Sequence, residues 1–360
     1  MFWNLQRRSF ELNESDIGAE TGHSSETSAA LARRSVLKAA GAGALALGAI
    51  GSASTPAAAT GQVTRTTTTN NVNLYCNVKM GQFDAAGNGS MVVTCGNFGP
   101  DDATGPVSLK FITPFYVNVP SLPSVVGGTS SWLYQNTAAN VPSIIKVAFS
   151  GMAAGSSVAI TVSLTLEANA PNAPAAGRAI FTTDASNTVD VDSDLTRNCW
   201  PVYSVRQSAN SPSAGSVNLQ FVHHEVPLVI GGSAAQIPFR FYNGAGHVLS
   251  GTRSVSYFTF STPFYTRVPS SGRPPGLSAL YENDDPAVPS VYQLQLPAGV
   301  GSLGAGVPTT VHIPFQAQLG APFGHNGGGG IYVPSGLDTQ GDFSNSHHRM
   351  PFLLVNTGAV

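Results

Sequence analysis

The chain contains the stretch FITPFYVNVP at Phe111–Pro120, and a closely similar stretch, FSTPFYTRVP, returns at Phe260–Pro269. Two more matches follow at nearly the same separation: Leu133-Tyr134-Gln135-Asn136 with Leu280-Tyr281-Glu282-Asn283, and Val141-Pro142-Ser143 with Val288-Pro289-Ser290. Chance does not keep one spacing over three blocks. The sequence therefore indicates that one domain has been duplicated.

Weaker matches extend the repeat in both directions. Asn97-Phe98-Gly99 has a counterpart in Asn243-Gly244-Ala245, while Asp190, Asp194 and Pro201 pair with Asp338, Asp342 and Pro351. We expect a signal peptide over residues 1–59, disordered or helical, then copy one over 60–198 and copy two over 199–360.

Each copy has the pattern of short strands separated by turn residues, with no sustained helical period. Val158–Leu166, for example, alternates apolar and small polar residues. The sequence predicts an all-β fold of two tandem β-sandwiches. We expect the glycine-rich segments Gly299–Gly304 and Gly327–Gly330 to be loops. The strands expected are Val72–Lys79, Ser90–Gly96, Gly105–Thr113, Ile144–Ser150, Ser157–Leu166, Ala179–Thr183, Ser216–His223, Gln236–Tyr242, Ser254–Ser261, Ser290–Leu296, Thr309–Gln316 and Met350–Val355.

One motif carries a family resemblance. Asn97-Phe98-Gly99-Pro100 follows a predicted strand, and an Asp-rich turn, Asp190-Val191-Asp192-Ser193-Asp194, precedes Asn198. This arrangement resembles the "conserved repeat" immunoglobulin-like domains of bacterial surface proteins. The resemblance covers about half of copy one and is weaker in copy two, which lacks the proline. It implies an immunoglobulin-like sandwich at a cell surface, and no shared chemistry.

The N-terminal region has the form of an export signal. Arg33-Arg34 is followed by Lys38, by an apolar stretch from Ala39 to Ala53, and by the small residues Pro56-Ala57-Ala58-Ala59. The pattern resembles a twin-arginine signal, and the apolar stretch is too short to span a bilayer. We expect bacterial export by the twin-arginine route and an extracellular or wall-associated mature protein, without a membrane span.

Composition limits the class of partner. Only 10% of the residues are charged, and the formal net charge is −2. Nucleic-acid binding requires a basic face, which this composition does not supply. The remaining candidates for a partner are a cell-wall polymer and another surface protein.

Two cysteines in copy one suggest a disulfide. Cys76 and Cys95 lie on successive predicted strands joined by the hairpin Gly81–Gly89. Neighbouring antiparallel strands can bring two Cα atoms to the separation that a disulfide between their side chains requires. An exported protein permits such a bond. Cys199 has no evident partner in the sequence.

Two groups of residues are candidates for metal binding. Asp190, Asp192 and Asp194, with Asp338 and Asp342 in copy two, have the alternating oxygens of a calcium loop but lack its glycine and final glutamate; ordinary turn residues explain them equally well. The pairs His223-His224 and His347-His348 are poor zinc ligands, because adjacent strand residues point to opposite faces. We therefore expect no cofactor beyond a calcium ion.

Aromatic residues near the repeated strand ends are candidates for stacking on a ligand: Tyr116, Trp132, Tyr134, Tyr265 and Tyr281. They can equally pack into the cores. No catalytic motif is found, so the sequence leaves open whether the chain is an enzyme and favours a non-enzymatic structural or adhesive role at the cell surface. The alternatives are a bivalent carbohydrate or wall-polymer binder and a secreted hydrolase with an unrecognised site.

Overall fold

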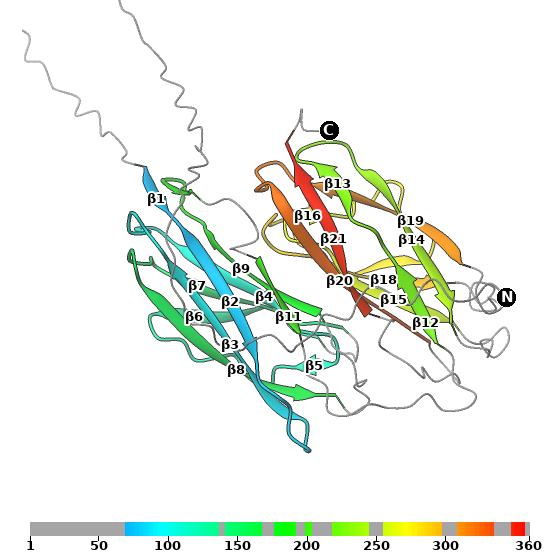
Figure 1. Ribbon diagram of the computed structural model, residues 1–360, viewed down its shortest axis with the longest axis horizontal. Coiled ribbons are helices and arrows are strands. Elements are labelled where there is room, and N and C mark those ends of the chain that lie inside the picture. The colour runs from blue at the N-terminus through cyan, green and yellow to red at the C-terminus, as the bar shows by residue number, and fades with distance from the viewer. Residues whose placement is uncertain are drawn as a thin grey trace, which may run out of the picture. The chain divides into compact units, whose positions relative to one another are not determined.

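The computed structural model describes residues 69–136, 141–167, 176–191, 199–203, 218–244, 255–296, 308–334 and 347–356. The expected signal, with Arg33 and Arg34, lies outside them, as do Gly299–Gly304, Asp192, Asp194, Asp338 and Asp342. Thr64–Val360 forms one compact unit. All its described elements are strands (Figure 1), so the fold is all-β, as the sequence predicts.

Two sheets face each other in copy one. Apolar residues alternate along β8, where Ile160, Val162 and Leu164 are buried and the residues between them are exposed. The buried face of each sheet contributes to one apolar cluster. The first sheet has the order β2 (Leu74–Met80), β3 (Asn88–Asn97), β8 (Ser157–Leu166) and β5 (Val117–Asn118); the second has the order β11 (Cys199–Tyr203), β9 (Ala176–Thr183), β4 (Val107–Ile112), β7 (Ile144–Phe149) and β6 (Gly128–Tyr134). Strand β1 (Asn70–Val72) pairs with β10 (Thr188–Asp190).

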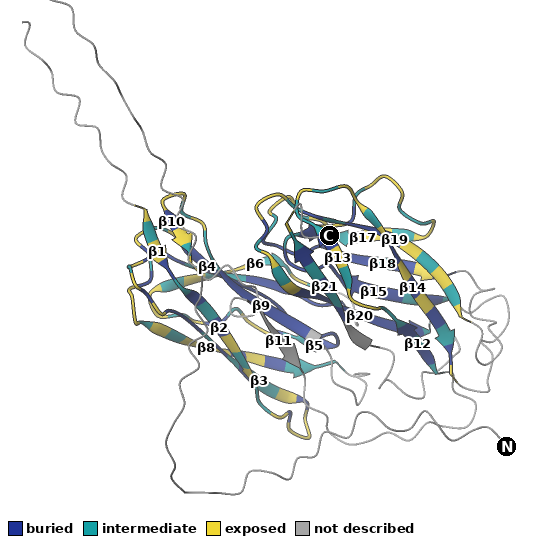
Figure 2. Cartoon of the chain, turned by 45° about the horizontal axis from the view of Figure 1, so that its top comes forward, coloured by how far each residue is buried: buried dark blue, intermediate teal, exposed yellow. Residues whose placement is uncertain are grey.

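Copy two repeats this arrangement. Its core is rich in phenylalanine, with stacked, tilted or edge-on contacts among Phe239, Phe241, Phe258 and Phe260. Figure 2 shows its central strands as buried. One sheet has the order β12 (Leu219–Val222), β14 (Ala235–Asn243), β19 (Thr309–Ala317) and β16 (Thr266–Arg267); the other has the order β13 (Val226–Val229), β21 (His347–Val355), β20 (Gly324–Pro334), β15 (Ser256–Ser261), β18 (Val291–Leu296) and β17 (Leu277–Tyr281).

Most strands of the two copies correspond, with β1, β10 and β13 outside the matched orders. The order β11-β9-β4-β7-β6 matches β21-β20-β15-β18-β17, and β2-β3-β8-β5 matches β12-β14-β19-β16. Tyr116 and Tyr265, at the same place in the repeat, are the two non-glycine residues with positive φ among those described, at 60° and 58°. Such a conformation is uncommon for a bulky residue, so its recurrence supports the duplication. Because β11 pairs with β9, it completes copy one, although the sequence placed these residues at the start of copy two.

The motif Asn97-Phe98-Gly99 recurs as a hydrogen-bonding arrangement. The Asn97 side chain accepts from the amide of Asn73 at 3.1 Å, and the Phe98 amide donates to the Asn73 carbonyl at 2.8 Å. In copy two the Asn243 side chain accepts from the Asn218 amide at 2.9 Å, and the Gly244 amide donates to the Asn218 carbonyl at 2.7 Å. The asparagine satisfies the buried backbone where the chain leaves the strand.

The Gly327–Gly330 segment is the interior of a strand, and the expectation of a loop was wrong. It lies in β20, between β15 and β21. A Cβ on Gly328 would lie 2.6 Å from the Ser261 carbonyl oxygen and 2.4 Å from Met350 Cε, and one on Gly330 would lie 2.7 Å from the Phe258 ring. Close packing, and not a turn, requires glycine at positions 328 and 330.

Cys76 and Cys95 are neighbours in copy one but are not bonded to each other. Cys76 is the register partner of Cys95 across β2 and β3, as the sequence predicts. Both side chains are buried, and the expected bond between them is absent from the structure. Burial raises the pKa of the Cys95 thiol to about 12. Disulfide formation requires a thiolate, and the buried surroundings of Cys95 disfavour its thiolate form.

Candidate functional site

The two copies contact each other through residues on and beside β4, β7, β9 and β18. All six residues of β4 are buried: Val107, Leu109 and Phe111 belong to the core of copy one, whereas Ile112 belongs to a cluster shared by both copies. This shared cluster is composed of residues from equivalent positions, namely Val141 and Ile144 of copy one and Val288 and Val291 of copy two. The contact is therefore close to two-fold symmetric.

The repeated tyrosines Tyr134 and Tyr281 stack on each other at this contact. Their ring centroids are 5.0 Å apart with an interplanar angle of 25°, and both rings pack against the shared cluster. Trp132 packs against the core of copy one. These three candidate ligand-stacking aromatics thus make contacts within the protein.

Two basic side chains of copy one extend into the contact and break its symmetry. Lys110, 1% exposed, lies 3.6 Å from carboxylate oxygens of both Asp184 and Asp285. Arg178 is buried, donates to the carbonyl of Thr262, and lies over the Phe264 ring at 5.0 Å. Since a buried cation requires such partners, these contacts fix how the copies associate.

The equivalent tyrosines Tyr116 and Tyr265 have different surroundings. Tyr116 is 9% exposed and packs with Phe115, Ile331 and Val333, and burial raises its pKa. Tyr265 is half-buried and lines a cavity of about 290 Å³. The cavity is lined by Ile180, Thr182, Thr183, Asp190, Tyr265, Gly320, Ala321, Pro322, Phe323 and Asn356.

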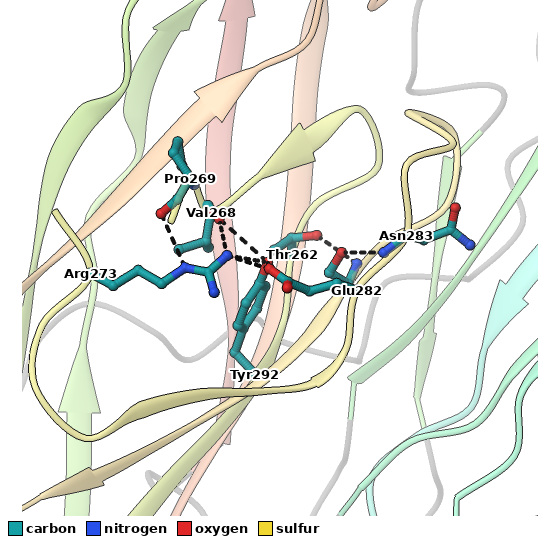
Figure 3. A network of polar contacts seen from close by, with 8 residues as sticks. Thr262, Val268, Pro269, Arg273, Glu282, Asn283 and Tyr292 are labelled. Atoms are coloured by element: carbon teal, nitrogen blue, oxygen red, sulfur yellow. Dashed lines mark hydrogen bonds and ion pairs between the residues drawn. The ribbon is translucent and has the colours of Figure 1, made fainter. Parts of the chain in front are cut away.

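A polar network in copy two, which the sequence did not suggest, surrounds Glu282 (Figure 3). Arg273 forms an ion pair with Glu282 and donates to the carbonyls of Val268 and Pro269 at 2.7 and 3.1 Å. The Tyr292 hydroxyl donates to Glu282 Oε1 at 2.7 Å. Burial raises the pKa of Glu282, but the hydrogen bonds from Tyr292 and Arg273 outweigh it and lower the pKa overall.

This network stabilises a loop and is not suited to proton transfer. Burial and the adjacent Glu282 both raise the pKa of Tyr292, so the phenol stays protonated. The Tyr292 hydroxyl keeps its proton and donates it in a hydrogen bond to Glu282, and Arg273 already pairs with that carboxylate. Neither group is therefore free to act as a general base. The neighbouring bond from the Ser290 amide to Thr262 Oγ1, at 3.0 Å, recurs in copy one as Ser143 to Thr113 at 2.9 Å, which marks it as part of the repeated scaffold.

His223 is held neutral between aromatic rings. Its ring stacks on Phe239 at 4.8 Å and lies 4.9 Å from Phe352, and Nε2 lies 3.0 Å from the carbonyl of Pro351. Burial lowers the pKa of His223 to about 4, and the charge of His224 contributes in the same direction. Its role is packing.

Lowering the pH should therefore destabilise the protein through His223. The unfolded state binds a proton near pH 6.5 and the folded state only near pH 4. This contribution is complete above pH 6.5 and is lost as the pH falls toward 4, by on the order of 2 kcal/mol. Denaturant unfolding of His223→Gln and of the wild type from pH 8 to 4.5 measures it. The wild type should lose more stability, and the exposed His224→Gln should behave like the wild type; parallel curves for all three would contradict the assignment.

The structure brings together no group of three or more His, Cys, Asp or Glu side chains suited to a metal ion among the residues it describes. Asp190 accepts a hydrogen bond from the Leu74 amide at 3.3 Å. His325, another residue that the sequence analysis did not single out, pairs with Glu225 at 2.6 Å on the surface. The calcium site thus stays a prediction, since its other aspartates lie outside the described ranges.

Comparison with known proteins gives no functional assignment. No family model matches the chain, and no curated protein matches it. Among solved structures it is similar to the partial N-terminal region of an enterococcal surface protein, at 8% identity and a TM-score of 0.25, over 79% of this chain and 96% of that one. It is also similar to red sea bream transglutaminase, at 10% identity and a TM-score of 0.22, over 79% of this chain and 31% of that one.

No helix long and apolar enough to cross a membrane occurs in the described parts of the chain.

Proposed function

We propose that the mature chain is an exported, non-enzymatic tandem of immunoglobulin-like sandwiches with a structural or adhesive role at the bacterial cell surface. The observation that carries the proposal is the contact between the copies. The shared apolar cluster and the buried Lys110 and Arg178 join the two sandwiches into one unit. A rigid module of this kind suits load-bearing or display better than catalysis, which would require a polar site.

Several features of the chain support the same role. The Asn97-Phe98-Gly99-Pro100 motif resembles surface-protein repeats, and the segment around Arg33-Arg34 resembles a twin-arginine signal. The polar groups of the network around Glu282 are paired with one another. A bivalent ligand-binding role has less support, because Tyr116 is buried whereas Tyr265 lines a cavity.

Protease treatment of intact cells tests the location. We expect protease to remove the mature chain from the cell surface while a cytoplasmic marker stays intact, and we expect the purified protein to bind isolated walls or a surface protein. A chain found only in the cytoplasm, or turnover of ester, glycosidic or peptide substrates by the purified protein, would contradict the proposal.

Export should depend on the arginine pair beside the apolar stretch. We expect Arg33→Lys with Arg34→Lys to leave the uncleaved precursor in the cytoplasm, because twin-arginine transport reads this pair. Arg7→Lys with Arg8→Lys is the matched control, since no apolar run follows that pair, and it should be exported normally. Immunoblots of cytoplasmic and external fractions measure both. Unimpaired export of the Arg33 and Arg34 variant would show that another signal is used.

A further inference from the structure

The inference concerns the cavity beside Tyr265, where the two copies differ. Residues on β9 and β20 correspond through their equal pairing with β4 and β15: Ile180 with Ile331, and Thr182 with Val333. In one half of the contact Tyr116 packs on Ile331 and Val333. In the other half Tyr265 packs against the apolar cluster that contains Ile180, and together with Thr182 both residues line a cavity of about 290 Å³.

The backbone around both tyrosines is the same, so the difference lies in the surrounding side chains. The Glu167 amide donates to the Tyr116 carbonyl at 3.0 Å, and the Gln318 amide donates to the Tyr265 carbonyl at 2.8 Å. The positive φ is also shared. Where one half has the apolar Val333, the other half has Thr182, whose hydroxyl lies at the cavity wall. The duplicated position has thus kept its geometry and changed its chemistry.

The lining of the cavity combines apolar surfaces with groups that form hydrogen bonds. Tyr265 and Phe323 provide aromatic rings, and Phe323 is 53% exposed. Thr182, Thr183 and Asn356 offer donors and acceptors, and Asp190 is the one ionisable carboxylate in the lining. No basic residue lines the cavity, which disfavours an anionic ligand. Its size lies at the lower end for ligand sites, which run from about 300 to 1,000 Å³.

We propose that this cavity binds one neutral sugar ring, either as a free monosaccharide or as the terminal unit of a glycan. A sugar ring presents an apolar C–H face, which stacks on an aromatic ring, and hydroxyls, which pair with hydroxyl, amide and carboxylate groups. The inference does not depend on the structural role proposed above. A surface module can pass the location test and still fail to bind sugar.

Ligand-observed NMR on the purified mature protein tests the proposal. The probes are glucose, galactose, N-acetylglucosamine and its trimer, with glucuronate as the anionic probe. We expect saturation transfer to at least one neutral probe and none to glucuronate. A preference for the monosaccharide or the trimer distinguishes a free sugar from a glycan end.

Three variants locate the binding. Phe323→Ala should weaken binding of the best probe at least about tenfold, because it removes a stacking ring. Thr182→Val, which reproduces the residue of the filled position, should also weaken it. Leu319→Ala is the control, since Leu319 is 84% exposed in the same segment and does not line the cavity, and it should bind like the wild type. The proposal fails if no neutral probe binds at millimolar concentration, if glucuronate binds equally well, or if Phe323→Ala keeps wild-type affinity.

Discussion

Gly328→Ala should lower the free energy of unfolding by about 2–3 kcal/mol, within the range measured for overpacked interiors. The added Cβ would lie 2.6 Å from the carbonyl oxygen of Ser261 on the neighbouring strand. Met350 Cε, the other close atom, ends a flexible side chain and can move aside. The backbone carbonyl cannot move without separating β15 from β20. Chemical denaturation followed by tryptophan fluorescence measures the loss.

A control on the same strand separates packing from strand propensity. His325→Ala changes an exposed residue of β20 whose contact is the surface ion pair with Glu225, and such pairs contribute little. We expect it to cost less than about 1 kcal/mol. Gly330→Ala, whose Cβ would meet the Phe258 ring at 2.7 Å, should resemble Gly328→Ala. A Gly328→Ala protein as stable as the wild type would mean that β20 and β15 are not so closely packed.

The error at Gly327–Gly330 shows where a local pattern fails. Four successive glycines have no side chains, so neither alternation nor β-propensity can mark them as a strand. What selects glycine here is the proximity of Ser261 and Phe258, which are far away in the sequence. By contrast, the strands around Ile160 and Leu294 were predicted well, since each has one face in a core and one in contact with polar surroundings.

The contact between the copies could be predicted only in part. The repeat places Tyr134 and Tyr281 at equivalent positions, but nothing local says that they stack on each other. Strand β4 gave one hint, because Lys110 places a charge in a mostly apolar strand, and that charge must find partners. Those partners, Asp184 and Asp285, lie in turns of different copies. The cavity beside Tyr265 depends on the same association and was equally out of reach.

Ile144→Asp should uncouple the two sandwiches. Ile144 is fully buried in the shared cluster with Val288 and Val291 of copy two. The cluster itself contains no cation, and the nearby Lys110 and Arg178 already have partners in Asp184, Asp285 and the Thr262 carbonyl. Burying a further carboxylate there costs several kcal/mol. The wild type should unfold in one calorimetric transition, because each copy stabilises the other through this cluster. The variant should show two transitions, or one at much lower temperature with the other copy intact.

A substitution at Ile145, the neighbour of Ile144, distinguishes uncoupling of the copies from a general loss of stability. Ile145 points to the opposite face and packs in the core of copy one, so Ile145→Val should lower the transition temperature and keep a single transition. Val291→Asp, at the position in copy two equivalent to Ile144, should uncouple the copies as Ile144→Asp does. If Ile144→Asp and Val291→Asp leave one sharp transition, or if the wild type already shows two, the copies fold independently. The shared cluster would then not join the two sandwiches into a rigid module.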